Sequence, residues 1–546
     1  MGLLDGITAA NRDVSKTPPS PGQDCRDVVH IALFFDGTGN NRFEDEAKQS
    51  WSNVARLFFA ARDEPNNSIY RIYISGVGTK YNLPSRYWGE SLDAWVEDQT
   101  LGGGAGLGGD RRLDGGGSQV NDALEKALLN SARSEGGKVK KIAEKMEGDG
   151  FQKMMASLSK HRLIKTIHFS IFGFSRGAAL ARAFSNRLAN DLKGDGKGGY
   201  TYQGVPAYIN FLGVFDTVAS FGLPGKNWGG WSPKALHVPT QVEMCHHYVA
   251  AHELRYSFPV DLIRDQNGYG DNWHERVYPG VHSDVGGGYE AGKQGRKDTL
   301  GRVPLMHMLE AAIGQGVRLN SVDFLRKTNA PIAKRLIVDQ ETADAYKQYT
   351  QAAGASGGTV EEQVKRHMAA YYAYRGTQHR AKVGAKQANE RRLTELRRQL
   401  AQTKSEENQA ESTKWHEFAV GTVPSWWKAR KKEGELEGRI GSLEDELAAA
   451  EKDAARLAES DSDIAVQAYA LRRAIEKKSS LTLQDGQLVL VLEKQPWMLD
   501  AWRSSASKEV CQFFDNYVHD SRTDFIRGHE PFVYFRTRDK HQQTMG

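Results

Sequence analysis

Residues 163–181 read LIKTIHFSIFGFSRGAALA, an apolar run followed by a stretch of small residues. The apolar run predicts a β-strand, and the alanines after it predict a helix that can approach a sheet closely. At the junction lies Gly173-Phe174-Ser175-Arg176-Gly177, which fits the G-x-S-x-G pattern of a sharp strand-to-helix turn. Because the neighbours of such a turn must be small, Gly173 and Gly177 fit its steric needs. This stretch predicts an α/β fold of the hydrolase type.

Further apolar runs with the character of strands surround this stretch, at residues 28–35, 68–77 and 208–215. Helix-like stretches separate them, for example residues 120–130 and 178–192. Continuous apolar strands separated by helices are typical of a mostly parallel sheet with helices on both faces. The glycine-rich residues 102–117 are expected to be irregular, as a lid or a close-packed turn. We therefore predict an α/β-hydrolase-like domain over residues 28–350, after a flexible lead-in at 1–27.

The character of the chain changes after residue 350. Residues 351–358 have the composition of a linker, and residues 360–460 are highly charged with a helical pattern. Apolar residues recur there at alternating spacings of four and three, at Leu436, Ile440, Leu443, Leu447, Ala450, Ala454 and Leu457, with a similar pattern at Leu393, Leu396 and Leu400. Two such helices joined by a loop would pair as an antiparallel, coiled-coil-like hairpin. We predict this hairpin as an insertion over residues 351–478.

The C-terminal residues 479–546 are expected to pack back on the α/β domain. Residues 481–492 read LTLQDGQLVLVL, where Asp-Gly between apolar runs is the signal of a β-hairpin. Residues 508–525 return to a helix-like apolar pattern. The helical hairpin would then interrupt a single catalytic unit.

Composition is that of a soluble globular protein, since 39% of the 546 residues are hydrophobic and 26% are charged. With 73 basic and 68 acidic residues, the net charge of +5 gives no reason to expect nucleic acid as a partner. No apolar run is as long as a membrane span, and residues 1–24 lack the pattern of a secretory signal. We expect a protein that stays in the cytoplasm or leaves it through a signal-independent machine. Cys25, Cys245 and Cys511 form neither a metal pattern nor a disulfide framework, and no metal or cofactor is expected.

Ser175 is the candidate nucleophile, because the turn would hold its hydroxyl free above the sheet. A G-x-S-x-G pattern also arises by chance in long chains, but here strand, turn and small-residue helix coincide. The oxyanion of an acyl-transfer reaction needs backbone N–H donors. One is expected from Arg176, and the other from Gly37 or Thr38 in the loop after the first strand. Asp36 is expected to shape that loop.

A serine nucleophile needs a base and an orienting carboxylate, and in this fold the chain order is nucleophile, acid, histidine. Asp216 ends the apolar run FLGVF, where a strand would deliver it to the same sheet edge as Ser175. A helix cap or turn is the alternative role for an aspartate in that position. We interpret Asp216 as the catalytic acid.

Two histidines compete as the base. His282 lies in the glycine-rich stretch PGVHSDVGGGY, which is well placed to reach a neighbouring loop. His519 lies near the C-terminus in a helical pattern, which favours a structural or supporting role. His246 and His247 are expected in a helix, without a case for catalysis. Asp284 is an alternative acid, but it lies two residues from His282 and is also suited to capping the loop.

Four motifs follow one another along the chain: FFDGTGN at 34–40, GFSRGAALAR at 173–182, FLGVFDTVAS at 211–220 and PGVHSDVGGGY at 279–289. Together they resemble the α/β-hydrolase domain of type VI secretion lipase effectors, and in particular the first family of these antibacterial phospholipases. The resemblance covers residues 28–320 and the YVHDS stretch near the C-terminus. It implies hydrolysis of phospholipid acyl esters in a target cell's membrane, with Ser175, Asp216 and His282 as the triad.

The resemblance also implies a route and partners. Members of the family are cytoplasmic until a contractile secretion machine delivers them on a VgrG-type spike protein, here into the periplasm of a target cell. A cognate immunity protein protects the producer. Two other functions stay open from the residues alone: a carboxylesterase or thioesterase acting on soluble substrates, and a non-catalytic adaptor that uses the helical hairpin.

The predicted tip of the hairpin, residues 415–432, combines aromatic and basic side chains. Its large aromatic residues are Trp415, Phe418, Trp426 and Trp427, and a basic cluster follows them directly. Tryptophan beside basic residues suits the boundary between acyl chains and anionic headgroups, and aromatic residues are also favoured at protein interfaces. We therefore expect the tip to contact a membrane or the delivery spike, with packing onto the hydrolase domain as the alternative.

Overall fold

The computed structural model describes residues 27–79, 107–161, 163–219, 236–265, 268–458, 462–476, 482–485, 488–491, 495–522 and 533–541. The chain divides into two compact units. Unit 1 comprises residues 1–371, 484–490 and 507–546, and unit 2 comprises residues 372–483 and 491–506. The predicted lead-in up to residue 26, with Cys25, lies outside the described residues.

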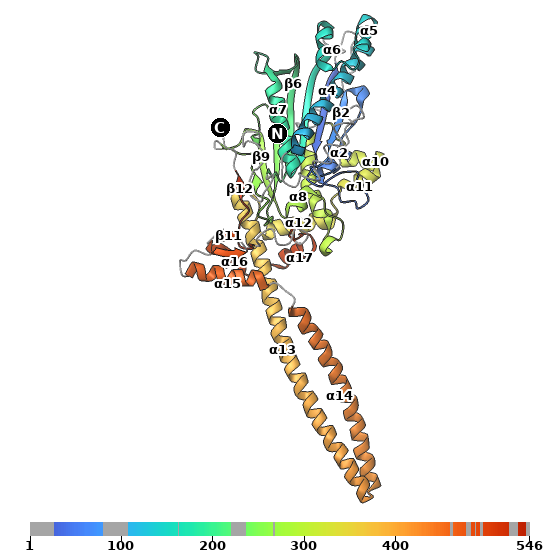
Figure 1. The fold of residues 1–546 in the computed structure, drawn as a ribbon, viewed down its shortest axis with the longest axis vertical. Coiled ribbons are helices and arrows are strands. Elements are labelled where there is room, and N and C mark those ends of the chain that lie inside the picture. The colour runs from blue at the N-terminus through green and yellow to red at the C-terminus, as the bar shows by residue number, and fades with distance from the viewer. Residues whose placement is uncertain are drawn as a thin grey trace. The chain divides into compact units, whose positions relative to one another are not determined.

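A parallel sheet forms the centre of unit 1 (Figure 1). Its strands run in the order β2 (Ile69–Ile74), β1 (Asp27–Phe35), β3 (Ile164–Phe174), β6 (Val205–Phe215), β7 (Cys245–Ala250) and β9 (Trp273–Tyr278). The short strands β5 (Tyr200–Tyr202) and β4 (Leu192–Gly194) extend it beside the start of β6 in antiparallel pairing. From β1 the chain passes to β2 on one side and later to β3 on the other, so a topological switch point lies between β1 and β3. Ligands of open α/β sheets bind beyond the carboxyl ends of the strands at such a point.

Both faces of the sheet are buried. Alternate residues of β1 contribute to different cores, because successive side chains of a strand point to opposite faces. Leu33 joins a core that includes α4 (Leu107–Glu135) and α7 (Arg176–Asp191), whereas Phe34 joins a second core that includes α2 (Asn53–Ala60) and α9 (Arg302–Gly314). The predicted α/β architecture, with helices on both faces, is confirmed.

The remaining elements of unit 1 complete these layers. The helices are α5 (Gly137–Lys145), α6 (Phe151–Leu158), α8 (His282–Gly286), α10 (Val322–Thr328), α11 (Ala330–Leu336), α12 (Gln340–Ala352) and α17 (Lys508–Asn516). The short strands β8 (Val260–Asp261) and β12 (Lys540–His541) pair with each other. The strands β10 (Thr482–Asp485) and β11 (Leu488–Val491) also pair, and their outer residues 482, 483 and 491 belong to unit 2. The ring of Phe513 in α17 stacks on Tyr349 of α12 at 4.1 Å between centroids. The chain therefore returns to unit 1 after the helical insertion.

The expectation that residues 102–117 are irregular is wrong for the part that the structure describes. Residues from Leu107 onward form the start of α4. A Cβ on Gly116 would lie 3.4 Å from the ring of Phe184, whereas one on Gly117 would meet no atom within 4 Å. Arg112 anchors this turn, because its guanidinium donates to the carbonyls of Ser75 and Gly76 at 2.7 and 2.8 Å. Tertiary contacts thus outweigh the low helix propensity of glycine.

Three expectations about histidines are also wrong. His246 and His247 lie in strand β7 rather than in a helix, because they pair with neighbouring strands and find ring and carboxylate partners there. His519 lies three residues beyond the last residue of α17, Asn516, rather than inside a helix. His282, expected in a loop, is the first residue of the short helix α8.

Unit 2 is mostly helical in its described part and contains α13 (Val360–Val420) from Tyr372 onward, α14 (Val423–Ala458), α15 (Ser462–Glu476) and α16 (Pro496–Arg503). The helices α13 and α14 lie side by side as a hairpin (Figure 1). The predicted seam is present, since Leu396, Leu443 and Ala450 form a buried cluster with Leu393, Leu400 and Leu447 packed against it. Ion pairs cross between the helices at Arg397–Glu451, Lys404–Glu444 and Lys414–Glu433. Along these three pairs the residue number increases in α13 and decreases in α14. The two helices are therefore antiparallel, as predicted.

Candidate active site

Ser175 stands where the chain turns from β3 into α7. Its backbone has φ 58° and ψ −127°, in a region that residues with a side chain rarely adopt. Its N–H donates to the carbonyl of Phe215 at 3.0 Å, and its carbonyl accepts from the N–H of Val218 at 3.3 Å. These bonds hold the strained turn against the loop that follows β6. The turn has the geometry that a nucleophile elbow requires.

The two glycines of the elbow are required by close backbone contacts. A Cβ on Gly177 would lie 2.2 Å from the carbonyl oxygen of Asp36, and one on Gly173 would lie 2.6 Å from Cα of Ala178. Real Cβ atoms essentially never approach other atoms so closely. Gly177 therefore lets the elbow pack directly on the end of β1, where the candidate oxyanion loop begins.

The candidate oxyanion donors lie around this contact. Arg176 occupies the first position of α7, where helix N–H groups have no acceptor within the helix. Its side-chain Nε donates to Oγ1 of Thr38, which ties the helix start to the loop after β1. The N–H of Gly37 already donates to Oδ1 of Asp36 at 2.8 Å. Within the described part of the chain the N–H of Thr38 has no acceptor, which favours Thr38 over Gly37 as the second donor.

Asp36 shapes the loop, as expected. Its Oδ2 accepts from the hydroxyl of Tyr73 at 2.5 Å, while Oδ1 accepts from Gly37. Burial raises the pKa of Asp36 above its ordinary value. These bonds hold the backbone of residues 36–38 in place beside the elbow.

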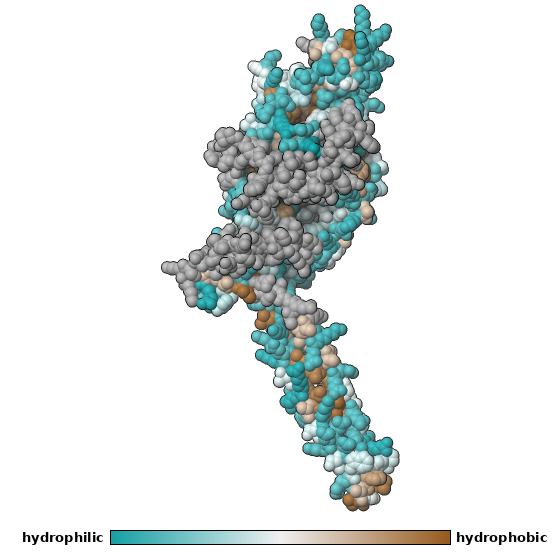
Figure 2. Space-filling view, viewed as in Figure 1, coloured by the Kyte–Doolittle hydropathy of each residue, from teal (hydrophilic) through white to brown (hydrophobic). Residues whose placement is uncertain are grey.

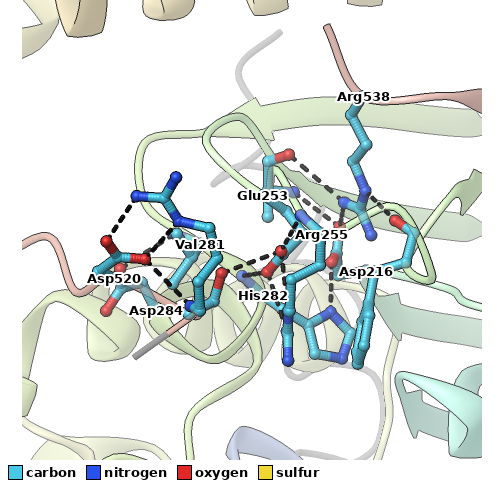
Figure 3. Close-up of polar contacts among 12 residues, drawn as sticks. Asp216, Glu253, Arg255, Val281, His282, Asp284, Asp520 and Arg538 are labelled. Carbon is cyan, nitrogen blue, oxygen red and sulfur yellow. Dashed lines mark hydrogen bonds and ion pairs between the residues drawn. The ribbon is translucent and has the colours of Figure 1, made fainter. Parts of the chain in front are cut away.

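Asp216 and His282 are brought together by the ends of β6 and β9 (Figure 3). Oδ2 of Asp216 lies 2.5 Å from Nδ1 of His282, and both side chains are buried. The ring of His282 also lies 4.7 Å from that of Phe174, the residue before Ser175. Among the described residues, neither Nε2 of His282 nor the hydroxyl of Ser175 makes a hydrogen bond. Ser175 and Asp216 therefore follow the carboxyl ends of the neighbouring parallel strands β3 and β6, and the ring of His282 packs on the residue before Ser175.

The ionisation of this pair follows from burial and neighbouring charge. Burial alone would raise the pKa of Asp216, but Arg538 and His282 outweigh it and hold the pKa below its usual range. Burial lowers the pKa of His282, and the bond to Asp216 opposes this only in part. The lowered pKa favours the neutral imidazole, which is the form in which a histidine can accept a proton.

A second buried carboxylate, Glu253, lies next to the pair and is not predicted from the sequence (Figure 3). Its Oε2 accepts from the backbone N–H of His282 at 3.2 Å, and both of its oxygens accept from the guanidinium of Arg255 at 2.9 Å. Burial would raise the pKa of Glu253, but Arg255 and Arg538 help to lower it to about 2. The sequence feature that could have indicated Glu253 is its place shortly after the end of strand β7. It fixes the backbone that carries His282.

His519 does not contact Asp216. Its Nδ1 lies 2.6 Å from Oδ1 of Asp284, and its backbone N–H donates to Oδ2 of the same carboxylate at 3.1 Å. Oδ2 of Asp284 also accepts from the N–H of Val281 at 3.0 Å, and the ring of His519 stacks on Tyr289 at 3.9 Å. Asp284 thus caps the turn that presents His282. His519 and Asp284 form a supporting pair beside the first one.

The loop after Asp216 has its own support, which sequence analysis also missed. Nε2 of His247 accepts from the N–H of Thr217 at 3.1 Å, while Nδ1 of His247 lies 2.6 Å from Oε1 of Glu275. The imidazole is fully buried. The role of His247 is therefore to hold the backbone beside Asp216.

Comparison with known proteins finds a family match for part of the chain. Residues 195–311 match the family model described as T6SS, Phospholipase effector Tle1-like, catalytic domain. The predicted resemblance to type VI secretion phospholipase effectors is therefore confirmed. The matched segment carries Asp216, Glu253 and His282, whereas Ser175 precedes it. No curated protein matches the chain.

Similar solved structures include the following two. The crystal structure of an uncharacterized protein from Pseudomonas aeruginosa is 24% identical, covers 99% of this chain and 82% of its own, and superposes with a TM-score of 0.60. This likeness supports the fold. The second is the structure of the Tle1 effector bound to the VgrG spike from the Type 6 secretion system. It is 19% identical over 65% of this chain and 88% of its own, with a TM-score of 0.37.

The candidate contact residues at the hairpin tip are largely exposed. Trp415, Phe418 and Trp427 are 59%, 64% and 60% exposed, and Trp426 is half-buried. Figure 2 shows apolar residues gathered at that end of the hairpin. Among the described helices, none combines the length and apolarity needed to cross a bilayer. Within the same residues no cluster of His, Cys, Asp and Glu side chains is suited to a metal ion.

Proposed function

We propose that this protein is a serine hydrolase that cleaves acyl esters of membrane phospholipids, with phospholipase A activity. The observation that supports the proposal is a strained serine elbow after β3, beside the parallel strand β6, whose end carries the buried Asp216 that bonds His282. The family match of residues 195–311 supports phospholipid as the substrate class. Ser175 is the nucleophile, His282 the general base, and Asp216 the carboxylate that orients the imidazole.

The reaction follows from these roles. Oγ of Ser175 attacks the acyl carbonyl carbon while Nε2 of His282 takes the hydroxyl proton. The carbonyl oxygen becomes an oxyanion, for which the N–H groups of Arg176 and Thr38 are the proposed donors. The tetrahedral intermediate collapses to an acyl-serine and expels the lysophospholipid alkoxide, which receives the proton from His282. Water then hydrolyses the acyl-serine by the same steps, which releases the fatty acid and restores Ser175.

The hydrogen-bond geometry explains the separate roles proposed for Asp216 and His282. Asp216 accepts from Nδ1–H of His282 at 2.5 Å, which places the neutral ring's lone pair on Nε2. The positive charge that His282 gains in the transition state lies beside the carboxylate of Asp216. The N-terminus of α7, with the positive end of its helix dipole, faces the developing negative charge.

The biological setting is also a proposal. The family match supports a role as a type VI secretion effector. We propose that delivery is into the periplasm of a target bacterium on a VgrG-type spike, and that a cognate immunity protein protects the producer. The domain arrangement proposed for this setting is a catalytic domain at 28–350 completed by residues 479–546, with the hairpin of 351–478 inserted between them.

Fluorophosphonate labelling and vesicle hydrolysis test the catalytic proposal. We expect the probe to label Ser175, and Ser175→Ala to lose on the order of a thousandfold or more in lipid hydrolysis without unfolding. Ser134→Ala is the matched control, because this serine is exposed on α4 and bonds only its own helix. Mass spectrometry of the vesicle products identifies the bond that is cut. Near-normal activity in a folded Ser175→Ala variant would overturn the assignment.

The same measurements separate the two alternatives. Rapid hydrolysis of soluble esters or thioesters with intact vesicles would favour a carboxylesterase or thioesterase. An unlabelled, well-folded wild-type protein would favour a non-catalytic adaptor that acts through its helical hairpin.

A further inference from the structure

The carboxylate of Asp216 is held by more than its histidine. While Oδ2 faces His282, Oδ1 accepts from the backbone N–H of Ala250 at 2.8 Å and from Nη1 of Arg538 at 2.5 Å (Figure 3). Asp216 is fully buried, and its φ of 44° is unusual for a residue with a side chain. A carboxylate in this position cannot rotate without breaking bonds on both oxygens.

Arg538 reaches this carboxylate from a segment that lies 322 residues away in the chain. Its Nε donates to the carbonyl of Phe258 at 2.6 Å, and Nη1 also lies 3.4 Å from the carbonyl of Ala250. The side chain is 3% exposed. A planar guanidinium suits this task, because its donors have fixed directions and reach several acceptors at once.

The segment that carries Arg538 is itself fixed to the domain. Strand β12 pairs with β8, and the N–H of Val260 donates to the carbonyl of Asp539 at 2.9 Å. The N–H of Leu262 donates to the carbonyl of His541, also at 2.9 Å. These ladder bonds lie directly beside position 538, so Arg538 is presented from an anchored backbone.

Arg538 also balances charge around His282. The ionised groups that face the imidazole come from the end of β6, the loop after β7 and the C-terminal segment, and they are Asp216, Glu253, Arg255 and Arg538. Two carboxylates thus face two guanidiniums. The nearby residues Asp284 and His519 are hydrogen-bonded to each other. With Arg538 removed, the balance changes in favour of protonated His282.

We propose that Arg538 is a positioning residue for the reaction, which orients the carboxylate of Asp216 toward His282 and opposes premature protonation of the imidazole. The inference rests on the proposed function, and it adds the C-terminal segment to the catalytic unit. Arg538 itself does not touch the substrate. Its effect reaches Ser175 through Asp216 and His282.

The rate of fluorophosphonate labelling of Ser175 against pH tests this role, because it reports the state of His282 without a natural substrate. In the full-length protein, Arg538→Met is expected to lower the plateau rate about tenfold or more and to move the acidic limb about one pH unit upward. Arg538→Lys keeps the charge but loses the planar fork, so the rate falls and the limb stays in place. Arg536→Met is the matched control, since Arg536 is buried in the same segment and bonds Asp539 instead.

The outcomes separate this inference from the proposed function. A wild-type protein that is not labelled at Ser175 overturns the proposed function, and this inference with it. A labelled wild type whose Arg538→Met variant folds and keeps both the rate and the limb overturns the inference alone. Should Arg538→Met not fold, Arg538→Lys decides, because a wild-type rate in that variant overturns the orienting role. Shifts of equal size in Arg536→Met also overturn it.

Discussion

Nδ1 of His519 lies 2.6 Å from Oδ1 of Asp284, so the second candidate histidine is paired with a carboxylate other than Asp216. Its backbone N–H bonds the same aspartate, and its ring stacks on Tyr289. His519 thus resembles the base geometrically in having an aspartate partner. Its hydrogen bonds to Asp284 instead stabilise the turn at residues 281–284, which carries His282.

We predict that His282→Ala is far more damaging than His519→Ala. The first variant removes the proposed base and is expected to lose on the order of a thousandfold in ester hydrolysis, and Asp216→Asn is expected to be comparably severe. The second removes support from the turn and is expected to lose about tenfold. Rates on a soluble short-chain ester, measured for folded variants, check this order. A dead His519→Ala variant beside an active His282→Ala variant would transfer the base role to His519.

Gly177→Ala is predicted to disturb the elbow through one methyl group. Its Cβ would lie 2.2 Å from the carbonyl oxygen of Asp36, which forces the elbow away from the end of β1. We expect a loss of about 1–3 kcal/mol in the free energy of unfolding and a large fall in fluorophosphonate labelling. Urea denaturation gives the first quantity. In the control Gly194→Ala the new Cβ meets no atom within 4 Å, so equal effects of the two substitutions would refute the argument.

Glu253 is predicted to make stability depend on acid pH. Its pKa falls from 4.5 to about 2 on folding, so it stabilises the native state above pH 4.5, and this contribution is lost as the pH falls toward 2. Glu253→Gln should therefore be less stable than wild type at pH 7 by on the order of 3 kcal/mol. The gap should shrink as the pH is lowered. Denaturation series at several pH values between 7 and 3 measure it, and a constant gap would contradict the prediction.

The sequence predicts those elements of the fold whose pattern lies in adjacent residues, and it does not predict those that depend on distant partners. The strands around Ser175 are continuous apolar runs, so residues 28–35 and 208–215 are recognisable alone, and the elbow has a pattern of fixed length. The start of α4 is not recognisable, because its glycines have low helix propensity and its Arg112 finds acceptors in Ser75 and Gly76 only in the folded chain. Strand β7 contains two adjacent histidines whose partners are supplied only by the folded sheet.

The candidate site shows the same division. Asp216 and His282 follow strand-like runs, and they occur in the chain order that the fold requires. For this reason the sequence predicts both as candidate site residues. Arg538 has no such signal, because it acts from 322 residues away and its neighbours in sequence form no recognisable motif. Long-range partners of a catalytic residue thus become visible only when the chain is folded.

The tip of the helical hairpin is predicted to bind the surface of an anionic membrane. Phe418 and Trp427 are more than half exposed, at 64% and 60%, and the rings of Phe418 and Trp426 lie 6.4 Å apart, so the aromatic residues form one group. The exposed cations that follow are Lys428, Arg430, Lys431 and Lys432. The seam of the hairpin is already filled by its own leucines. Exposed aromatic rings beside several cations match the boundary between acyl chains and anionic headgroups.

The double variant Trp426→Ala, Trp427→Ala tests the tip. We expect hydrolysis of anionic vesicles to fall about tenfold or more, with hydrolysis of a soluble short-chain ester unchanged, because the substitutions remove interfacial anchoring and leave the elbow intact. Tyr469→Ala is the control, since Tyr469 is a similarly exposed aromatic residue on α15. Loss of spike binding with normal vesicle activity would show that the tip serves delivery instead. A variant that keeps vesicle hydrolysis, spike binding and stability would show that the exposed aromatic group has neither role.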